Sequence, residues 1–312
     1  MRNRVEALAE MIKGYQYIDD PYYLAEVLSE RPLKSAILNK RLITNRDLIT
    51  NILKESYPDL KCISYGRQDA CMTRYNIGSH LFHHMGLYYI TNYVNSLYPI
   101  LINLDRVNGI VLDISAAPGG KTFLISNYLY PDKPLIIAND PYKRRLSRLT
   151  SNINRLGLDN VIVTSYMGED FPLIDDIKLI IFDAPCTSID QFYKNPDDVL
   201  KNLRNINKYV RIQRSILKRM YEVLSVDGIL VYSTCTLTIE ECEEVAEYGI
   251  KLGLKVLKPK NIPAKYYKGV TEWNNKKYDS SISNTVKILP DLNYKQYSGN
   301  IGLLYIAVFK KV

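Results

Sequence analysis

Two cysteines follow apolar segments that are expected to be buried strands. Cys186 comes after "IIFDAP" and Cys235 comes after "ILVYST", each at the start of a loop. In a parallel sheet the carboxyl ends of the strands share one edge, and ligands bind there. These positions favour a functional role for both side chains, since a thiolate is a nucleophile and a metal ligand. We interpret Cys62, Cys71 and Cys242 as small buried apolar residues, a common role of free cysteine.

A glycine-rich junction and an acidic strand end accompany the thiols. In "DISAAPGGKT" a strand gives way to a helix at Gly119 and Gly120, where free amides favour an anionic group and the missing side chains admit a ligand. Asp140 follows about 20 residues later, the spacing at which a carboxylate reaches a ribose hydroxyl pair. Together these features indicate an adenosine-containing cofactor. The alternative for Asp140 is a helix cap. The alternative for the glycine-rich junction is an ATP-binding P-loop, but that motif begins with a glycine where this sequence has Ser115.

The elements that must position these loops alternate along the chain. From residue 109 onward, apolar strands alternate with amphipathic helices, which predicts an α/β domain with a parallel sheet covered on both faces. One long helix is expected over residues 197–226. Strands are expected over residues 109–114, 134–140, 160–165, 177–185, 228–235 and 301–312.

The segment before the alternating region has a different pattern. Residues 1–75 predict a small N-terminal α/β module, in which a short strand precedes a helix within residues 34–60. Residues 76–102 predict a loop and an apolar helix leading into the main domain. We therefore divide the chain into a module of residues 1–75 and a main domain of residues 76–312.

Composition and charge exclude several classes of protein. The 312 residues are 46% hydrophobic and 24% charged, as in ordinary soluble proteins. Without a signal peptide or a membrane span, the expected location is the cytoplasm. Five widely spaced cysteines without a CxxC pair argue against a disulfide framework and a structural zinc site. We interpret His80, His83 and His84 as packing or surface residues and expect no metal. The formal charge of +8 suggests a polyanionic partner.

Four segments resemble successive motifs of the RNA cytosine-5 methyltransferases of the Nol/Nop/Sun (RsmB-like) family. They are "LDISAAPGGKT", "ANDPYKRRLSRLTSNINRLG", "IIFDAPC" and "LVYSTCTLTIEECEEV". The resemblance covers roughly residues 30–312, and the chain length is similar to that of short archaeal tRNA-modifying members. It implies a class I Rossmann-like methyltransferase domain with a mostly parallel sheet of seven strands, and S-adenosylmethionine as the cofactor.

The resemblance also assigns catalytic roles. Carbon 5 of cytosine is a poor nucleophile, so a thiolate must first add to carbon 6, and covalent addition splits one hard step into two. The family's nucleophile maps to Cys235, and Cys186 corresponds to the cysteine that assists release of the product. Asp183 is implied to hold ring nitrogen 3 and help protonate it. Lys121 is implied near the cofactor and the base, where its charge would lower the pKa of the thiol.

The same resemblance implies a cofactor site. The sequence also departs from the family pattern, as at Met167 and Tyr193. Met167 stands where aspartate usually meets the adenine edge, so it can pack on the ring but cannot accept the amino proton. Tyr193 stands where arginine is common. Thr238 and Glu241 form a capping-box pattern expected to start the helix after Cys235. The residues expected at the cofactor are Ser115, Ala116, Ala117, Pro118, Gly119, Gly120, Lys121, Asp140, Met167 and Asp183.

The expected substrate is RNA, and tRNA is favoured over other RNAs. The protein is expected to act as a monomer and to bind neither a metal nor a membrane. The N-terminal module is expected to position the RNA, and basic side chains on two helices can meet phosphates. The alternatives are rRNA as the substrate, or a degenerate methyltransferase that binds RNA without turnover. The basic residues are Lys143, Arg144, Arg145, Arg148 and Arg155 on one helix, and Lys194, Lys201, Arg204, Lys208, Arg211, Arg214 and Lys218 around the other.

Overall fold

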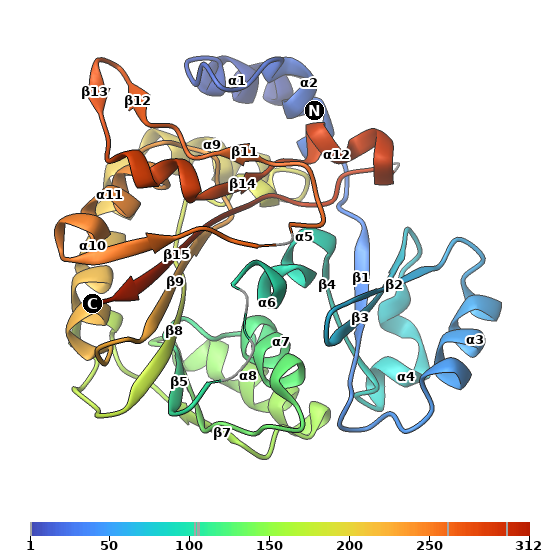
Figure 1. The fold of residues 1–312 in the computed structure, drawn as a ribbon. Helices are drawn as coiled ribbons and strands as arrows, with labels where there is room; N and C mark the ends of the chain where they lie inside the picture. The colour runs from blue at the N-terminus through green and yellow to red at the C-terminus, as the bar shows by residue number, and fades with distance from the viewer. Residues whose placement is uncertain (1, 103, 105–106, 261, 298) are drawn as a thin grey trace.

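The structure is a computed structural model that describes residues 2–102, 104, 107–260, 262–297 and 299–312. The described residues form three sheets, a small antiparallel one near the N-terminus, a large mixed one and a short two-stranded hairpin (Figure 1). Among the described residues, no helix is long and apolar enough to cross a membrane.

The small sheet has the strand order β2-β3-β1-β4. Asn45 begins α3 by accepting a hydrogen bond from the amide of Leu48, the role expected of an N-cap residue. The sheet packs on α3 around the buried Leu38, Leu53 and Tyr88. Its elements are β1 (Lys34–Leu38), α3 (Arg46–Ser56), β2 (Lys61–Tyr65), β3 (Gln68–Thr73), η1 (Ile77–Ser79), α4 (Leu81–His84) and β4 (Tyr88–Asn92).

Two expectations for this region are wrong. The predicted apolar helix within residues 76–102 is instead β4 followed by two short helices, α5 (Tyr93–Ser96) and α6 (Tyr98–Leu101). Cys62 and Cys71 are not independent packing residues, because they face each other on β2 and β3 and form a disulfide. Direct cross-strand neighbours approach closely enough for such a bond.

The first two helices pack against the main domain. Helices α1 (Arg2–Ile12) and α2 (Pro21–Ser29) contribute Leu8, Ile12 and Leu24 to the same buried cluster as the large sheet. Asp20 caps α2 through the amide of Tyr23. The boundary at residues 75 and 76 stays a prediction, and β4 of the small sheet lies beyond it.

The large sheet confirms the predicted fold class. Its order is β11-β14-β15-β9-β8-β5-β6-β7, with β10 paired to β15, so the part of the chain that the structure describes contributes nine strands where seven were expected. The five strands from β9 to β7 are parallel, and β15 joins them antiparallel to β9. The strands are β5 (Ile110–Asp113), β6 (Ile136–Asn139), β7 (Val161–Thr164), β8 (Ile177–Asp183), β9 (Ile229–Thr234), β10 (Leu254–Leu257), β11 (Tyr267–Lys268), β14 (Val286–Ile288) and β15 (Leu304–Lys311).

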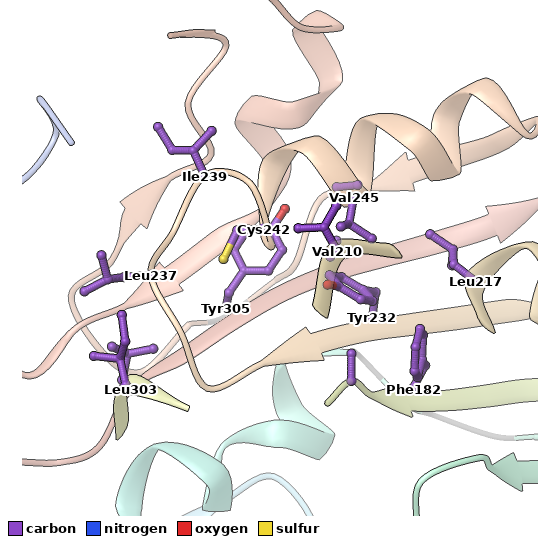
Figure 2. Close-up of a cluster of buried hydrophobic side chains, with 14 of the residues drawn as sticks. Phe182, Val210, Leu217, Tyr232, Leu237, Ile239, Cys242, Val245, Leu303 and Tyr305 are labelled. Atoms are coloured by element: carbon purple, nitrogen blue, oxygen red, sulfur yellow. The ribbon is translucent and has the colours of Figure 1, made fainter. Parts of the chain in front are cut away.

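Helices cover both faces of this sheet (Figure 1). Ile180 and Phe182 of β8 pack into one buried cluster, while Leu179 and Ile181 pack into another, as the two-residue period of a strand requires. The first cluster includes Cys242, whose predicted packing role is confirmed (Figure 2). The covering helices are α7 (Gly120–Leu129), α8 (Lys143–Leu156), α9 (Pro196–Arg204), α10 (Ile206–Val223) and α11 (Glu243–Lys251).

The helix expected over residues 197–226 is two helices. Asn205 ends α9 and begins α10, and its side-chain amide donates to the carbonyl of Lys201 at 2.9 Å. Asparagine competes for backbone hydrogen bonds in this way and therefore favours helix boundaries. The remaining elements are η2 (Gly168–Asp170), η3 (Ile189–Gln191), β12 (Glu272–Trp273), β13 (Lys276–Lys277), η4 (Ser280–Asn284) and α12 (Pro290–Tyr297).

Asp113 at the end of β5 makes stability depend on pH. Burial raises the pKa of this carboxyl to about 7, although Thr122 donates a hydrogen bond to it at 2.7 Å. A raised pKa in the folded state means that its stabilising contribution is complete below the unfolded pKa and is lost as pH rises through about 7. An asparagine side chain at this position would keep an acceptor for Thr122 and would not ionise. The free energy of unfolding of Asp113→Asn should therefore rise relative to that of wild type by about 1.4 kcal/mol per pH unit between pH 4 and 7. Denaturant unfolding at several pH values measures the difference, and a constant difference would contradict the assignment.

Candidate active site

The two loop cysteines lie together at the carboxyl edge of the sheet. Cys186 follows β8 and Cys235 follows β9, and their sulfur atoms are 3.2 Å apart. Cys186 is buried and Cys235 is partly exposed. The loop after Cys235 is anchored by Leu237 and Ile239, whose buried side chains appear in Figure 2.

Cys235 is a neutral thiol in this arrangement. Its hydrogen bond with Cys186 is the largest of the causes that raise its pKa, followed by burial and by the nearby acidic groups Asp190 and Asp183. Lys121 is not among the largest causes that act on this thiol, so the expectation that its charge lowers the pKa of Cys235 stays a prediction. A nucleophilic Cys235 has to lose its proton as the substrate binds.

Asp183 and Lys121 form an ion pair beside the thiols. Lys121 Nζ lies 2.6 Å from Asp183 Oδ2, and the Ser233 hydroxyl donates to Asp183 Oδ1 at 3.0 Å. The Lys121 ammonium also lies over the ring of Tyr98, 5.1 Å from its centroid. Among the described residues, the charge of Lys121 thus contacts Asp183 and Tyr98 rather than either thiol. The carboxylate of Asp183 is 37% exposed, so it remains accessible to a ligand.

The glycine loop borders a cavity of about 170 Å³. Gly119 adopts a positive φ of 108° at the start of α7, and a Cβ on Gly120 would come within 3.0 Å of the Tyr89 hydroxyl oxygen. Ser115 donates to the carbonyl of Asp183 at 2.7 Å, which ties this loop to β8. The lining residues are Tyr89, Thr91 and Asn95 with Ser115, Ala116, Ala117, Pro118, Gly120, Lys121, Leu124 and Asp183.

The three residues from β4 and α5 were not predicted from the sequence. Tyr89, Thr91 and Asn95 reach the cavity because the segment expected to be a helix is a strand that ends beside the glycine loop. Two-residue alternation in "YYITN" was the signal available, since Tyr89 and Thr91 share one face of a strand.

Asp140 is fully buried at the end of β6. Its Oδ1 accepts a hydrogen bond from the amide of Tyr142 at 3.1 Å, and Arg145 Nη1 lies 3.1 Å from its Oδ2. That second oxygen accepts no hydrogen bond from the described residues. Asp140 does not cap α8, whose N-cap residue is Tyr142 and whose start has no side-chain cap. A buried carboxylate oxygen without a hydrogen bond suits a ligand hydroxyl.

Met167 lies outside the cavity, at the start of η2. Its side chain is 47% exposed, and those of its neighbour Tyr166 and of Tyr142, which follows β6, are also exposed. These side chains offer apolar surface at the same edge of the sheet as Asp140.

Glu241 has a different role from the predicted helix cap. Helix α11 begins two residues later, and its N-cap Cys242 makes no side-chain cap. The Glu241 carboxylate instead accepts hydrogen bonds from the Thr187 amide at 2.9 Å and hydroxyl at 2.6 Å, Gln213 at 3.0 Å and Thr238 at 3.0 Å. It therefore joins the loop after Cys186 to the loop after Cys235. The capping-box pattern gave no signal for this long-range role.

Residues 100–296, well over half of the chain, match the family described as 16S rRNA methyltransferase RsmB/F. The chain belongs to the RsmB/F family of RNA cytosine-C5 methyltransferases. The family uses S-adenosylmethionine as its methyl donor.

Relatives within this family act on different RNAs. The tRNA (cytosine(49)-C(5))-methyltransferase of Pyrococcus abyssi is 27% identical over 307 residues, covering 97% of this chain and 96% of that protein. The 25S rRNA (cytosine-C(5))-methyltransferase nop2 of Schizosaccharomyces pombe is 30% identical over 232 residues. That match covers 72% of this chain but only 37% of the yeast protein.

Solved structures share this fold over nearly the whole chain. A methyltransferase homolog from Pyrococcus horikoshii superposes with a TM-score of 0.79 at 24% identity, covering 100% of both chains. NSun6 from Pyrococcus horikoshii, solved with SFG, superposes with a TM-score of 0.76 at 18% identity and covers 98% of both chains.

Some of the basic residues expected to meet RNA have protein partners. Arg145 pairs with Asp140, and Arg155 donates to the carbonyl of His83 on the N-terminal side of the chain at 2.5 Å. Arg214 pairs with Glu244 at 3.3 Å. Each of these three guanidinium groups therefore has at least one partner within the protein.

Proposed function

We propose that this chain methylates carbon 5 of cytosine in tRNA, with Cys235 as the nucleophile that adds to carbon 6. The 3.2 Å contact between Cys186 and Cys235, beside the Asp183–Lys121 pair, is the observation that carries the proposal. One thiol can attack the base while the other assists its release. The match to the Pyrococcus abyssi tRNA enzyme along nearly the whole of both chains supports tRNA over rRNA.

The residues present fit S-adenosylmethionine. The glycine-loop cavity suits the amino-acid end of the cofactor, and Asp140 Oδ2, which accepts no hydrogen bond from the described residues, suits a ribose hydroxyl. When bound, the cofactor supplies an electrophilic methyl group. Met167 would offer an apolar contact to the adenine ring, and Asp183 would border the methyl-transfer region.

Removal of the Asp140 carboxylate should weaken cofactor binding without unfolding the chain. Asp140→Ala deletes the proposed ribose acceptor, so the Kd for S-adenosylhomocysteine should rise roughly tenfold or more. Titration calorimetry measures it without RNA. Lys143→Ala on the exposed start of α8 is the matched control and should bind like wild type. Equal affinity of both variants would remove Asp140 from the cofactor site.

The thiol and the carboxylate divide the chemistry on the base. Cys235 passes its proton to the Asp183 carboxylate as its sulfur bonds to carbon 6, and Asp183 delivers that proton to ring nitrogen 3. The electron pair then available at carbon 5 takes the methyl group. Loss of the carbon 5 proton to solvent lets the carbon–sulfur bond break, and the proton on nitrogen 3 returns through Asp183 to the departing sulfur, which Cys186 assists as its neighbouring thiol. A cytosine in folded RNA must also be extruded to reach this edge of the sheet.

Methyl transfer to tRNA and rRNA transcripts tests the substrate assignment. Wild-type protein should form 5-methylcytosine in tRNA, read by nuclease digestion and mass spectrometry, and Cys235→Ala should form none. Product in rRNA alone would overturn the tRNA assignment. Tight RNA binding with no product in any RNA would identify a binding protein instead.

A further inference from the structure

Asp190 lies behind the two cysteines, in the short 3-10 helix η3. The residue is 3% exposed. Its backbone amide donates a hydrogen bond to the carbonyl of Cys235 at 3.1 Å. The loop that follows Cys186 therefore holds the backbone of Cys235 directly, in addition to the contact between the two sulfur atoms.

The carboxylate of Asp190 reaches two other parts of the chain. Its Oδ1 accepts from the amide of Leu303 at 2.7 Å, just before β15, and its Oδ2 accepts from Asn92 Nδ2 at 3.1 Å, at the end of β4. Gln191 Nε2 also donates to Oδ2, at 3.1 Å. These segments are distant in sequence, so one buried side chain joins the small sheet, the large sheet and the cysteine loops.

Asn92 is itself fixed in one orientation. Its Oδ1 accepts from the amide of Asn95 at 3.1 Å, which leaves its amide nitrogen to face Asp190. The packing around it is close, because a Cβ on Gly302 would come within 2.5 Å of Asn92 Nδ2, and Gly302 has a φ of 92°. The pair thus meets at a site with no room for rearrangement.

We propose that Asp190 is a positioning residue for the nucleophile, which fastens the backbone of Cys235 to Asn92 of the small sheet and to the segment before β15. The inference rests on the proposed function, since it assumes that Cys235 attacks the base. It makes the position of the nucleophile depend on how the small sheet docks.

The contacts suit an ionised carboxylate. An ionised carboxylate accepts only, which matches the donors that meet both oxygens. Burial raises the pKa of Asp190 to about 6, while Lys34 and Lys121 act in the opposite direction, so the ionised form prevails near pH 8. Cys235 and Tyr193 are the other titratable groups that sense its charge.

An amide exchange tests the link between the two residues. Asp190→Asn keeps the shape and the backbone hydrogen bond to Cys235 but turns one acceptor into a donor that faces the amide of Asn92. The double variant Asn92→Asp with Asp190→Asn reverses the polarity of the pair at unchanged net charge. In it, the new amide at position 190 still accepts from Leu303 and donates to the new carboxylate at position 92, and only the bond from Gln191 is lost.

We expect Asp190→Asn to lose methylation activity and the double variant to recover it. Asp190→Asn should lower kcat for tRNA methylation roughly tenfold, with the KM for tRNA and the Kd for S-adenosylhomocysteine within about twofold of wild type. The double variant should recover to within about threefold of wild-type kcat. All assays are run well below the melting temperature of each variant, so that a purely structural loss does not enter.

Alkylation of Cys235 by iodoacetamide separates this inference from the proposed function, because it needs neither RNA nor cofactor. Peptide mass spectrometry should show faster alkylation of Cys235 in Asp190→Asn and the wild-type rate in the double variant. If wild type methylates nothing but alkylation follows this pattern, the proposed function fails and the positioning role stands. Unchanged kcat and alkylation in Asp190→Asn, or no repair in the double variant, would overturn the positioning role.

Discussion

Cys235→Ala should abolish methyl transfer, with a loss of about a thousandfold or more, because it removes the proposed nucleophile that adds to carbon 6 of the base. Cys186→Ala should have the opposite signature and accumulate a covalent complex with RNA. The hydrogen bond shared by the two thiols is the largest cause of the raised pKa of Cys235. Its removal should favour the thiolate and adduct formation while leaving the departing sulfur without its neighbouring donor.

Denaturing gels of protein incubated with RNA and S-adenosylmethionine distinguish the two variants. A slowly migrating band should appear for Cys186→Ala and be absent for Cys235→Ala. Cys242→Ala is the matched control, since this third free cysteine is fully buried in the core and should methylate like wild type if the protein folds. A covalent band from Cys235→Ala would mean that the two roles are reversed.

Glu241→Ala should destabilise the protein by about 3 kcal/mol or more, because it leaves four buried donors without their shared acceptor. Methyl transfer should fall with it, even at temperatures where the variant stays folded, since the loops that carry Cys186 and Cys235 are no longer joined through Thr187 and Thr238.

Glu241→Gln is the control for that experiment. Glutamine keeps one carbonyl acceptor for the Thr187 amide and Gln213, and hydroxyl groups can rotate to accept from the new amide. Glu241→Gln should lower the free energy of unfolding by about 1 kcal/mol relative to wild type. Chemical denaturation measures both variants, and equal stability of Glu241→Ala and wild type would show that this network does not hold the loops.

The parts of the site that follow from local pattern could be predicted from the sequence. Apolar strands ending at Asp113, Asp140, Asp183 and Cys235 indicated one edge of a parallel sheet, because strand ends in this architecture necessarily meet. Gly157 ends α8 with a φ of 65°, and a glycine just after a helical pattern is a local signal of a helix end. Such features depend on residues close in sequence.

The parts that depend on distant partners could not be predicted. The segment "YYITN" is apolar enough for a buried helix or a strand, and only pairing with β1 makes it β4. Glu241 satisfies a helix-cap pattern, yet its partners Thr187 and Gln213 lie on other elements. Lys121 was expected to act on the thiol, but Asp183 competes for its charge at 2.6 Å.

The central claim is that Cys235 bonds to the substrate cytosine. In tRNA transcripts containing 5-fluorocytosine, fluorine replaces the proton at carbon 5 and cannot leave as a cation, so the covalent complex is trapped on the wild-type enzyme. After incubation with S-adenosylmethionine and digestion, mass spectrometry should find one modified nucleotide attached to the peptide that contains Cys235. Attachment to Cys186, or no adduct with an enzyme that methylates normal tRNA, would contradict the account.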